Sequence, residues 1–235
     1  MTSEANMYNG PVIEAVGVSR VFGSGDAVVT ALSVISLTVE RGDFLAVTGR
    51  SGSGKTTLLN LLSGLDKPSS GSVMFDGKDL AEFSETNLME MRRHKIAFVF
   101  QSFGLMPLLS AQENVELPLH IGGVSWRERR DRAHKALVAV GLATRARHRP
   151  FELSGGEQQR VSIARALVTG PEVVFADEPT GELDTVTARS ISDTLGEVAA
   201  SRRATVIVAT HDLDLAVKAH RRLDLVDGVI VSLSS

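Results

Sequence analysis

The chain has 235 residues, of which 43% are hydrophobic, so it can bury the core of one domain with room for a subdomain. Its formal net charge of −3 argues against a nucleic-acid-binding protein, because such proteins normally carry a marked basic excess. The chain contains no cysteine, which excludes a disulfide scaffold and cysteine-based metal or redox chemistry.

The first residues give no sign of export or of membrane insertion. Residues 1–11 are predicted to form a loose tail that lacks the cationic start and apolar segment of a signal peptide. No apolar run approaches the roughly 18 residues that cross a bilayer. We therefore expect a soluble chain whose membrane role, if it has one, comes through a partner.

Short apolar runs alternate with helical patterns in the first hundred residues. Strands are expected at residues 12–16 and 34–39, with a turn at residues 23–26 between them, because apolar and polar residues alternate there. A buried strand at residues 44–48, a leucine-rich helix at residues 55–62 and strands at residues 73–75 and 96–100 follow.

The pattern changes after Gln101. Pro107 and Pro118 indicate a loop, and the helical spacing of apolar residues within 126–140 predicts a helical insertion. Apolar runs at residues 173–176 and 205–209 predict strands that are buried on both faces. Alternating strands and helices indicate an α/β domain with a largely parallel central sheet.

A glycine-rich loop joins the strand at residues 44–48 to the helix at residues 55–62. The loop fits the pattern G-x-x-x-x-G-K-[ST] and gives these candidates for ATP binding: Gly49, Arg50, Ser51, Gly52, Ser53, Gly54, Lys55, Thr56 and the adjacent Thr57. Such a P-loop turns backbone N–H groups toward a phosphate at the positive end of a helix dipole. Lys55 is expected to reach the β- and γ-phosphates, and the Thr56 hydroxyl to bind Mg²⁺. A chance glycine-rich turn is the alternative, against which the flanking strand and helix argue.

Two carboxylates, Asp177 and Glu178, directly follow the apolar run at residues 173–176. In parallel sheets ligands bind at the carboxyl ends of the strands. Asp177 therefore suits a Mg²⁺ ligand, and Glu178 suits the group that orients or deprotonates the attacking water. Taken alone, the pair has a solvated turn as an equal alternative, and the P-loop upstream favours the catalytic interpretation.

The segment Leu153-Ser154-Gly155-Gly156-Glu157-Gln158-Gln159-Arg160 resembles the signature motif of the ATP-binding cassette (ABC) ATPases. A serine N-cap followed by the bare N–H groups of a helix start is an anion site in its own right. Other motifs follow in the family's order. Phe22 stands where the family stacks an aromatic ring on adenine, Gln101 resembles the Q-loop glutamine, residues 181–184 with Asp184 resemble the D-loop, and His211 resembles the switch histidine.

Three of these assignments keep ordinary alternatives. Phe22 could serve ordinary packing, and Gln101 could be an amide in a loop without a functional role. His211 could be a histidine near a strand end whose hydrogen bonds are satisfied within the chain.

The resemblance covers nearly the whole chain and implies its fold and assembly. It implies an α/β P-loop NTPase of the ABC ATPase type with a parallel core sheet, an N-terminal antiparallel β subdomain and a helical subdomain inserted near residues 102–168, all in one domain at residues 12–235. It implies ATP and Mg²⁺, with Thr56, Gln101 and Asp177 at the metal. The catalytic residues that it implies are Lys55, Gln101, Glu178 and His211. Two copies of the chain are expected to meet head to tail, so that each signature closes over the other's P-loop. The resemblance adds the signature residues Ser154, Gly155, Gly156 and Glu157 and the D-loop residue Asp184 to the ATP site.

The finer resemblance is to the ATPase subunits of lipoprotein-releasing and macrolide-export transporters. The segments that carry it are residues 63–68, 98–103, 113–119 and 176–181. It implies a peripheral ATPase on the cytoplasmic face of the inner or plasma membrane. An integral membrane subunit is expected to dock near residues 101–123, where Phe103, Leu105, Met106, Leu108 and Leu109 offer apolar contacts. The alternatives are that these residues fill the chain's own core, that the chain is a soluble ABC ATPase without a membrane partner, or that it binds nucleotide without turnover.

Overall fold

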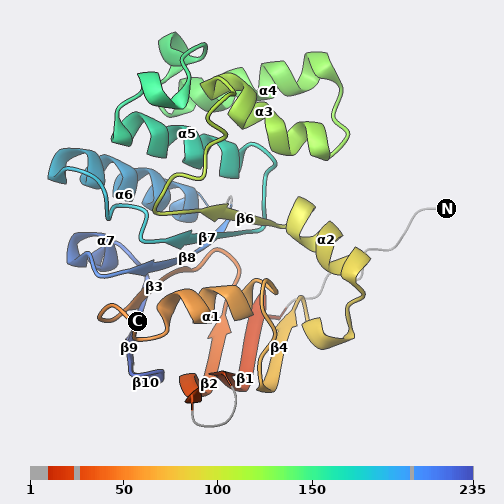
Figure 1. Cartoon of the computed structure of the whole chain (residues 1–235), viewed down its shortest axis with the longest axis vertical. Helices are drawn as coiled ribbons and strands as arrows, with labels where there is room; N and C mark the ends of the chain where they lie inside the picture. The colour runs from red at the N-terminus through yellow and green to blue at the C-terminus, as the bar shows by residue number, and fades with distance from the viewer. Residues whose placement is uncertain (1–9, 24–26, 202–203, 235) are drawn as a thin grey trace.

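The computed structural model describes residues 10–23, 27–201 and 204–234, which form two sheets and the helices that pack around them (Figure 1). Residues 1–9 of the predicted tail and residues 24–26 of the predicted turn lie outside the described residues. The parallel core sheet, the antiparallel N-terminal sheet and the helical insertion that were predicted are all present. The exact domain limits stay a prediction.

The N-terminal sheet is antiparallel and has the order β2-β1-β4-β5. Its strands are β1 (Ile13–Phe22), β2 (Val29–Val39), β4 (Ser70–Phe75) and β5 (Lys78–Asp79). The strands predicted at 12–16 and 34–39 are much longer than expected. Register shifts beside Val18 and a left-handed residue at Val34 (φ 52°) interrupt the alternation that the prediction relied on.

The central sheet has the order β10-β9-β3-β8-β7-β6. Its parallel strands are β3 (Phe44–Thr48), β6 (Ile96–Val99), β7 (Val173–Asp177), β8 (Thr205–Thr210) and β9 (Arg221–Val226). The antiparallel edge strand β10 (Val229–Ser234) follows a two-residue turn at Asp227 and Gly228, a hairpin signal that the sequence analysis missed. Because β3, β6, β7 and β8 are parallel, the P-loop, Gln101, the acidic residues and His211 all leave the sheet at one edge.

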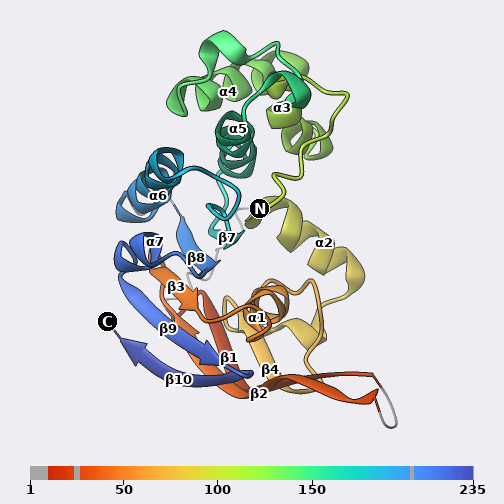
Figure 2. The ribbon, with the colours of Figure 1, turned by 60° about the vertical axis from the view of Figure 1, so that its left-hand side comes forward.

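Alternate residues of the central strands face two separate apolar clusters. Leu45 and Val47 of β3 pack with α1 (Lys55–Leu62) and the N-terminal sheet. Phe44 and Ala46 pack with α6 (Thr185–Ala200) and α7 (Leu213–Val217). Figure 2 shows α1 on one side of the sheet and α6 and α7 on the other. The sheet is therefore buried on both faces, as its near-continuous apolar strands predict.

The helical subdomain stands above the core in Figure 1 and has an apolar cluster of its own. It consists of α3 (Ala111–Ile121), α4 (Trp126–Ala139) and α5 (Gly155–Leu167), with 3₁₀ turns at Ala143–Arg145 and Pro150–Glu152. The prediction of a loop around Pro118 is wrong, because Pro118 lies inside α3. A reciprocal cap between Ser110 and Glu113 starts this helix, and the burial of Val115 and Leu119 holds it although the proline lacks an N–H.

After β5, a 3₁₀ turn at Leu80–Glu82 leads into α2 (Glu85–His94), which lies beside the core. Within residues 10–23, 27–201 and 204–234, no helix combines the length and the apolar character that a membrane span needs.

Candidate active site

The P-loop leaves β3 after Thr48 and enters α1 at Lys55. Gly54 has φ +102°, and a Cβ there would lie 2.6 Å from the carbonyl oxygen of Ala31, so only glycine fits this position. Arg50, Ser51 and Gly52 are exposed, whereas Ser53 is buried. Lys55 is almost fully buried, and its Nζ donates to the carbonyl oxygens of Gly49 at 2.9 Å and Arg50 at 3.3 Å. The loop therefore folds around the lysine ammonium.

Asp177, the last residue of β7, reaches the first turn of α1. Its Oδ2 accepts a hydrogen bond from the Thr56 hydroxyl at 2.8 Å, while its Oδ1 is buried and has no partner among the described residues. Burial raises the pKa of the Asp177 carboxyl above its ordinary value of 3.8, and the hydrogen bond from Thr56 opposes that shift. An unpartnered buried oxygen beside a hydroxyl suits a small divalent cation, which takes oxygen ligands and keeps several waters. The residues present therefore fit Mg²⁺.

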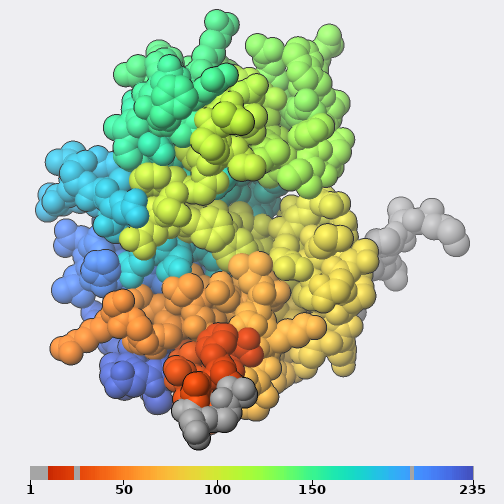
Figure 3. Space-filling view, viewed as in Figure 1, coloured from red at the N-terminus to blue at the C-terminus, as the bar shows by residue number. Residues whose placement is uncertain are grey.

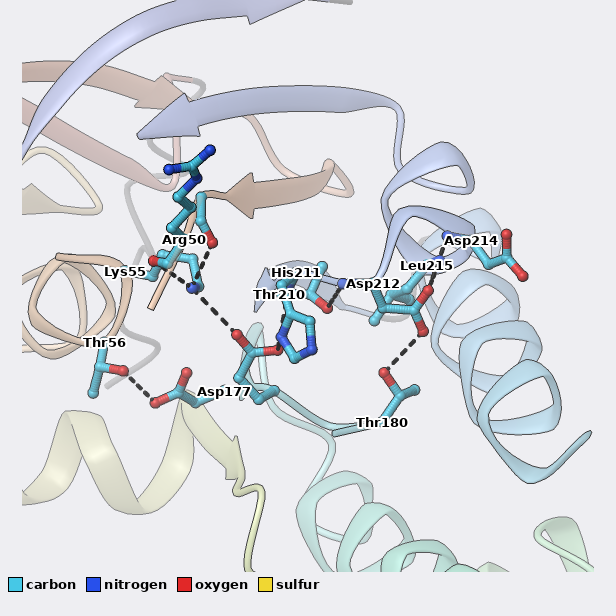
Figure 4. A network of polar contacts seen from close by, with 12 residues as sticks. Arg50, Lys55, Thr56, Asp177, Thr180, Thr210, His211, Asp212, Asp214 and Leu215 are labelled. Carbon is cyan, nitrogen blue, oxygen red and sulfur yellow. Dashed lines mark hydrogen bonds and ion pairs between the residues drawn. The ribbon is translucent and has the colours of Figure 1, made fainter. Parts of the chain in front are cut away.

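Glu178 lies between the P-loop and the end of β8. Its Oε1 is 3.3 Å from Lys55 Nζ, and its Oε2 lies 2.9 Å from His211 Nδ1 and accepts the backbone N–H of His211 at 3.2 Å (Figure 4). Its backbone is left-handed, with φ +46°, a conformation that L-residues other than Asn and Asp adopt rarely. Lys55 at the start of α1 and His211 after β8 thus converge on the Glu178 carboxylate.

The turn after Glu178 connects this cluster to Gln101. A Cβ placed on Gly181 would lie 3.4 Å from Nε2 of Gln101, so the glutamine amide packs against this turn. The Thr180 hydroxyl donates to Asp212 at 3.0 Å, and Asp212 also caps α7. Thr180 and Asp212 were not predicted from the sequence, although an aspartate next to His211 and just before a helix is a recognisable N-cap.

Figure 4 shows this network from close by, with these residues labelled: Arg50, Lys55, Thr56, Asp177, Thr180, Thr210, His211, Asp212, Asp214 and Leu215. Lys55 and Thr56 extend from α1 toward Asp177 and His211, across the carboxyl edge of the sheet.

A second cluster of candidate residues forms where α5 and α6 begin. Ser154 caps α5 by accepting the N–H of Glu157, whose carboxylate accepts the N–H of Ser154 at 2.9 Å and has its pKa lowered mainly by that bond. Asp184 caps α6, and the Thr187 hydroxyl donates to it at 2.7 Å. A Cβ on Gly156 would lie 2.3 Å from Thr187 Cγ2, so the two helix starts approach each other as closely as glycine allows.

The two clusters stay apart within one chain. Of the hydrogen bonds and ion pairs among the described residues, none joins the start of α5 or Asp184 to the P-loop. In Figure 1, α5 lies above β6 and β7, whereas α1 lies below β3. Phe22 is half exposed at the end of β1, with the Arg20 guanidinium 4.4 Å from its ring centroid. It belongs to neither cluster.

Known proteins share this arrangement. A sequence-family profile described as "ABC transporter" matches residues 32–181. A macrolide export ATP-binding/permease protein MacB of Hyphomonas neptunium is 46% identical over 94% of the chain, which spans 34% of that protein. A pyoverdine export ATP-binding/permease protein PvdT of Pseudomonas putida is 46% identical over 96% of the chain, again 34% of its own length.

Solved structures extend the similarity to three dimensions. The ATP-binding cassette MJ0796, described as dimeric in a post-hydrolysis state bound to ADP and Pi, superposes with a TM-score of 0.88 at 40% identity, covering 95% of this chain and 98% of its own. The cbiO1 protein of Clostridium perfringens, part of an ABC transporter complex, gives 0.85 at 29% identity over 96% of this chain and 88% of its own.

The chain thus has the whole cassette fold while spanning about a third of the curated relatives' length. The predicted resemblance, fold class and ATPase activity are confirmed, and ATP is the nucleotide that the family binds. The chain belongs to the ABC transporter family and is an ATPase cassette of that family.

Proposed function

We propose that this chain is the ATP-hydrolysing subunit of a membrane export transporter and that it works as a head-to-tail pair. The observation that carries the proposal is the separation of the two clusters: Lys55, Asp177 and Glu178 meet at one edge of the sheet, and Ser154 caps a distant helix start. Each cluster suits part of a phosphate site. Neither is complete without the other, which favours a site shared between two copies. The dimeric cassette MJ0796 supports the same assembly.

In this proposal the residues of one chain bind ATP and position the attacking water. Lys55 and the N–H groups of residues 49–57 hold the phosphates, and Phe22 stacks on the base. Glu178 polarises the water, and His211, 2.9 Å away, holds the carboxylate in place. Gln101, which follows β6, packs against the turn at Gly181 and contacts the water or the metal. The partner copy adds the start of its α5 and its Asp184.

Mg²⁺ would be held in this site by Thr56 and Asp177, with Gln101 as the third expected ligand. When bound, it would neutralise negative charge on the phosphates. The buried Oδ1 of Asp177 supports its placement, because an uncompensated carboxylate oxygen there costs free energy.

The membrane subunit is proposed to dock in a groove between α2 and α3. The groove has a volume of about 440 Å³. Apolar residues of four elements line it, among them Met89 of α2, Phe98 of β6, Leu117 and Ile121 of α3, and Ala166 of α5, together with the arginines Arg92, Arg93 and Arg165. Figure 3 shows α2 in yellow and the helical subdomain in green on either side of a hollow. The named relatives are ATP-binding/permease proteins, which supports a permease as the occupant.

Docking was predicted near residues 101–123, and of these residues we place the contact at the C-terminal part, because Leu117 and Ile121 line the groove. Leu105 packs on the apolar cluster of the helical subdomain, so it serves the chain's own core. Leu108 is 80% exposed and remains available for contact.

With the permease in the groove, the cassette lies at the cytoplasmic face of the membrane. Its substrate is proposed to be an exported compound, by analogy with relatives named for macrolide and pyoverdine export.

Phosphate release by the wild type and by Glu178→Gln tests the function. The variant is expected to bind ATP, to lose hydrolysis by a factor of roughly 10²–10⁴, and to form a stable dimer with Mg-ATP by light scattering. Glu197→Gln, which changes an exposed carboxylate on α6, is the control and keeps wild-type hydrolysis. Equal phosphate release by the wild type and Glu178→Gln, or a monomeric Glu178→Gln in Mg-ATP, contradicts the proposal.

A further inference from the structure

A buried amide on α5 touches both segments that carry the hydrolytic residues. Gln159 is 0% exposed, and its Nε2 donates to the carbonyl oxygen of Pro179 at 2.7 Å and lies 3.5 Å from that of Phe100. Pro179 follows Glu178, and Phe100 precedes Gln101. Gln159 therefore links the α5 helix to the backbone beside two proposed catalytic groups.

The orientation of this amide is fixed by its partners. Two carbonyl oxygens face the same end of the side chain, so that end must be the NH₂ group, and a flipped amide would place oxygen against oxygen. Oε1 is buried without a partner among the described residues. Leaving a buried acceptor unpaired is costly, so packing alone does not explain a glutamine here. The NH₂ group of the amide is what the site uses, because it donates to the carbonyl oxygen of Pro179.

The backbone that Gln159 holds is strained. Glu178 has φ +46°, and such a conformation persists only where the surrounding structure enforces it. Two backbone bonds act at this point: Glu178 N–H donates to Ala209 at 2.8 Å, and Gly181 N–H donates to the Glu178 carbonyl at 3.1 Å. Side chains hold the same turn from two elements: the Thr180 hydroxyl donates to Asp212 at 3.0 Å, and Gln159 of α5 donates to the Pro179 carbonyl at 2.7 Å.

α5 runs without interruption from its N-cap, Ser154, past Gln159 to Leu167. A shift of the helix start therefore moves Gln159 with it, because a helix of this length behaves as a rigid body. Under the proposed function, the start of α5 in one chain faces the ATP held by the partner copy, whereas Glu178 and Gln101 of that chain act on its own ATP.

We propose that Gln159 is a positioning residue that transmits the engagement of the α5 helix start to Glu178 and Gln101 of the same chain. This inference rests on the proposed function, in which two copies of the chain share each ATP site. The consequence is that ATP bound by one copy sets the backbone of the hydrolytic turn in the other, so the two sites of the pair turn over cooperatively.

Gln159→Met tests this, since it removes the donor at nearly constant volume. The steady-state phosphate release of the full chain is measured against ATP concentration, together with equilibrium ATP binding and thermal unfolding. The variant is expected to bind ATP within about twofold of the wild type, to lose kcat by at least roughly fivefold, and to drop in Hill coefficient from above 1 toward 1. Ser162→Ala is the control: this residue is equally buried on α5, and among the described residues its hydroxyl has Arg165, 3.5 Å away, as its one side-chain partner. It is expected to keep the wild-type Hill coefficient.

A Gln159→Met protein that retains both kcat and the wild-type Hill coefficient overturns the inference and leaves the proposed function standing. So does a fall in kcat that follows the loss of thermal stability with cooperativity intact, because that is the signature of a purely structural role. A wild type with a Hill coefficient of 1, together with a Glu178→Gln variant that stays monomeric in Mg-ATP, overturns the proposed function itself.

Discussion

The ammonium of Lys55 and the carboxylate of Glu178 form an ion pair at 3.3 Å, with 8% and 15% of their side chains exposed. One group comes from the P-loop and the other from the turn after β7. Their pairing brings the phosphate-binding loop against the residue proposed to polarise water. Under the proposed function, a γ-phosphate bound by Lys55 would lie next to Glu178, the residue proposed to hold the hydrolytic water.

Replacing Lys55 by alanine is expected to weaken ATP binding. The variant loses a charge-assisted contact worth on the order of 1.5–3 kcal/mol, which corresponds to a roughly 10- to 150-fold higher Kd. It also leaves Glu178 without its cation. Calorimetric titration with Mg-ATP gives the measurement. Lys67→Ala, which removes a lysine that is 77% exposed, is the matched control and binds normally. An unchanged Kd for Lys55→Ala would remove the lysine from the phosphate site.

Most of this site follows from the sequence because its parts are strand ends. Asp177 ends one apolar strand, His211 follows another, and the P-loop leads from a third to Lys55; parallel strands bring their carboxyl ends to one edge. Gln159 could not be found this way. Its role depends on where α5 lies against the turn at Pro179, and that contact joins residues 20 positions apart through packing that no local pattern encodes.

Asp177→Asn is expected to raise the Mg²⁺ concentration needed for hydrolysis while leaving ATP binding in the absence of metal unchanged. The amide keeps the acceptor for the Thr56 hydroxyl but removes the negative charge that attracts the cation. Phosphate release is measured across a Mg²⁺ titration at saturating ATP. Asp193→Asn, on the exposed face of α6, is the control. A variant that reaches half-maximal rate at the wild-type Mg²⁺ concentration contradicts the metal assignment.

Ile121→Ser is expected to weaken capture of the membrane subunit and to spare the ATPase activity of the isolated chain. Ile121 is 57% exposed and lines the groove between α2 and α3, so the change removes apolar contact area without opening the core. Co-purification from detergent-solubilised membranes is compared with phosphate release. Val138→Ser is the matched control, since Val138 is 52% exposed on α4 outside the groove. Equal capture by both variants would move the docking site elsewhere.

Helix α3 shows why the inserted region was the hardest to predict. Pro118 argues for a loop when it is considered alone, and the capping residues Ser110 and Glu113 argue for a helix. The structure resolves the conflict in favour of the cap, with Val115 and Leu119 buried in the cluster shared with α4 and α5. Tertiary burial decides between two local signals of opposite sign, and burial is what a single sequence does not reveal.

The cap between Ser110 and Glu113 makes the stability of the chain depend on pH. The Glu113 carboxylate accepts hydrogen bonds from the N–H and the hydroxyl of Ser110, at 2.8 and 2.7 Å, and these lower its pKa below the ordinary 4.5. A carboxyl group whose pKa is lower in the folded state binds fewer protons there than in the unfolded chain. Its contribution to stability is therefore complete above pH 4.5 and is lost as the pH falls through the folded-state pKa.

Glu113→Gln removes this contribution, so its free energy of unfolding is expected to lie below that of the wild type at pH 7 and to approach it as the pH falls below 4.5. Urea unfolding at a series of pH values measures the difference. Ser110→Ala is the companion variant: it costs about 1 kcal/mol through the lost cap, and it keeps part of the pH dependence because the backbone N–H of residue 110 still donates to Glu113. Parallel pH profiles for Glu113→Gln and the wild type would show that the Ser110 bonds do not favour the ionised carboxylate.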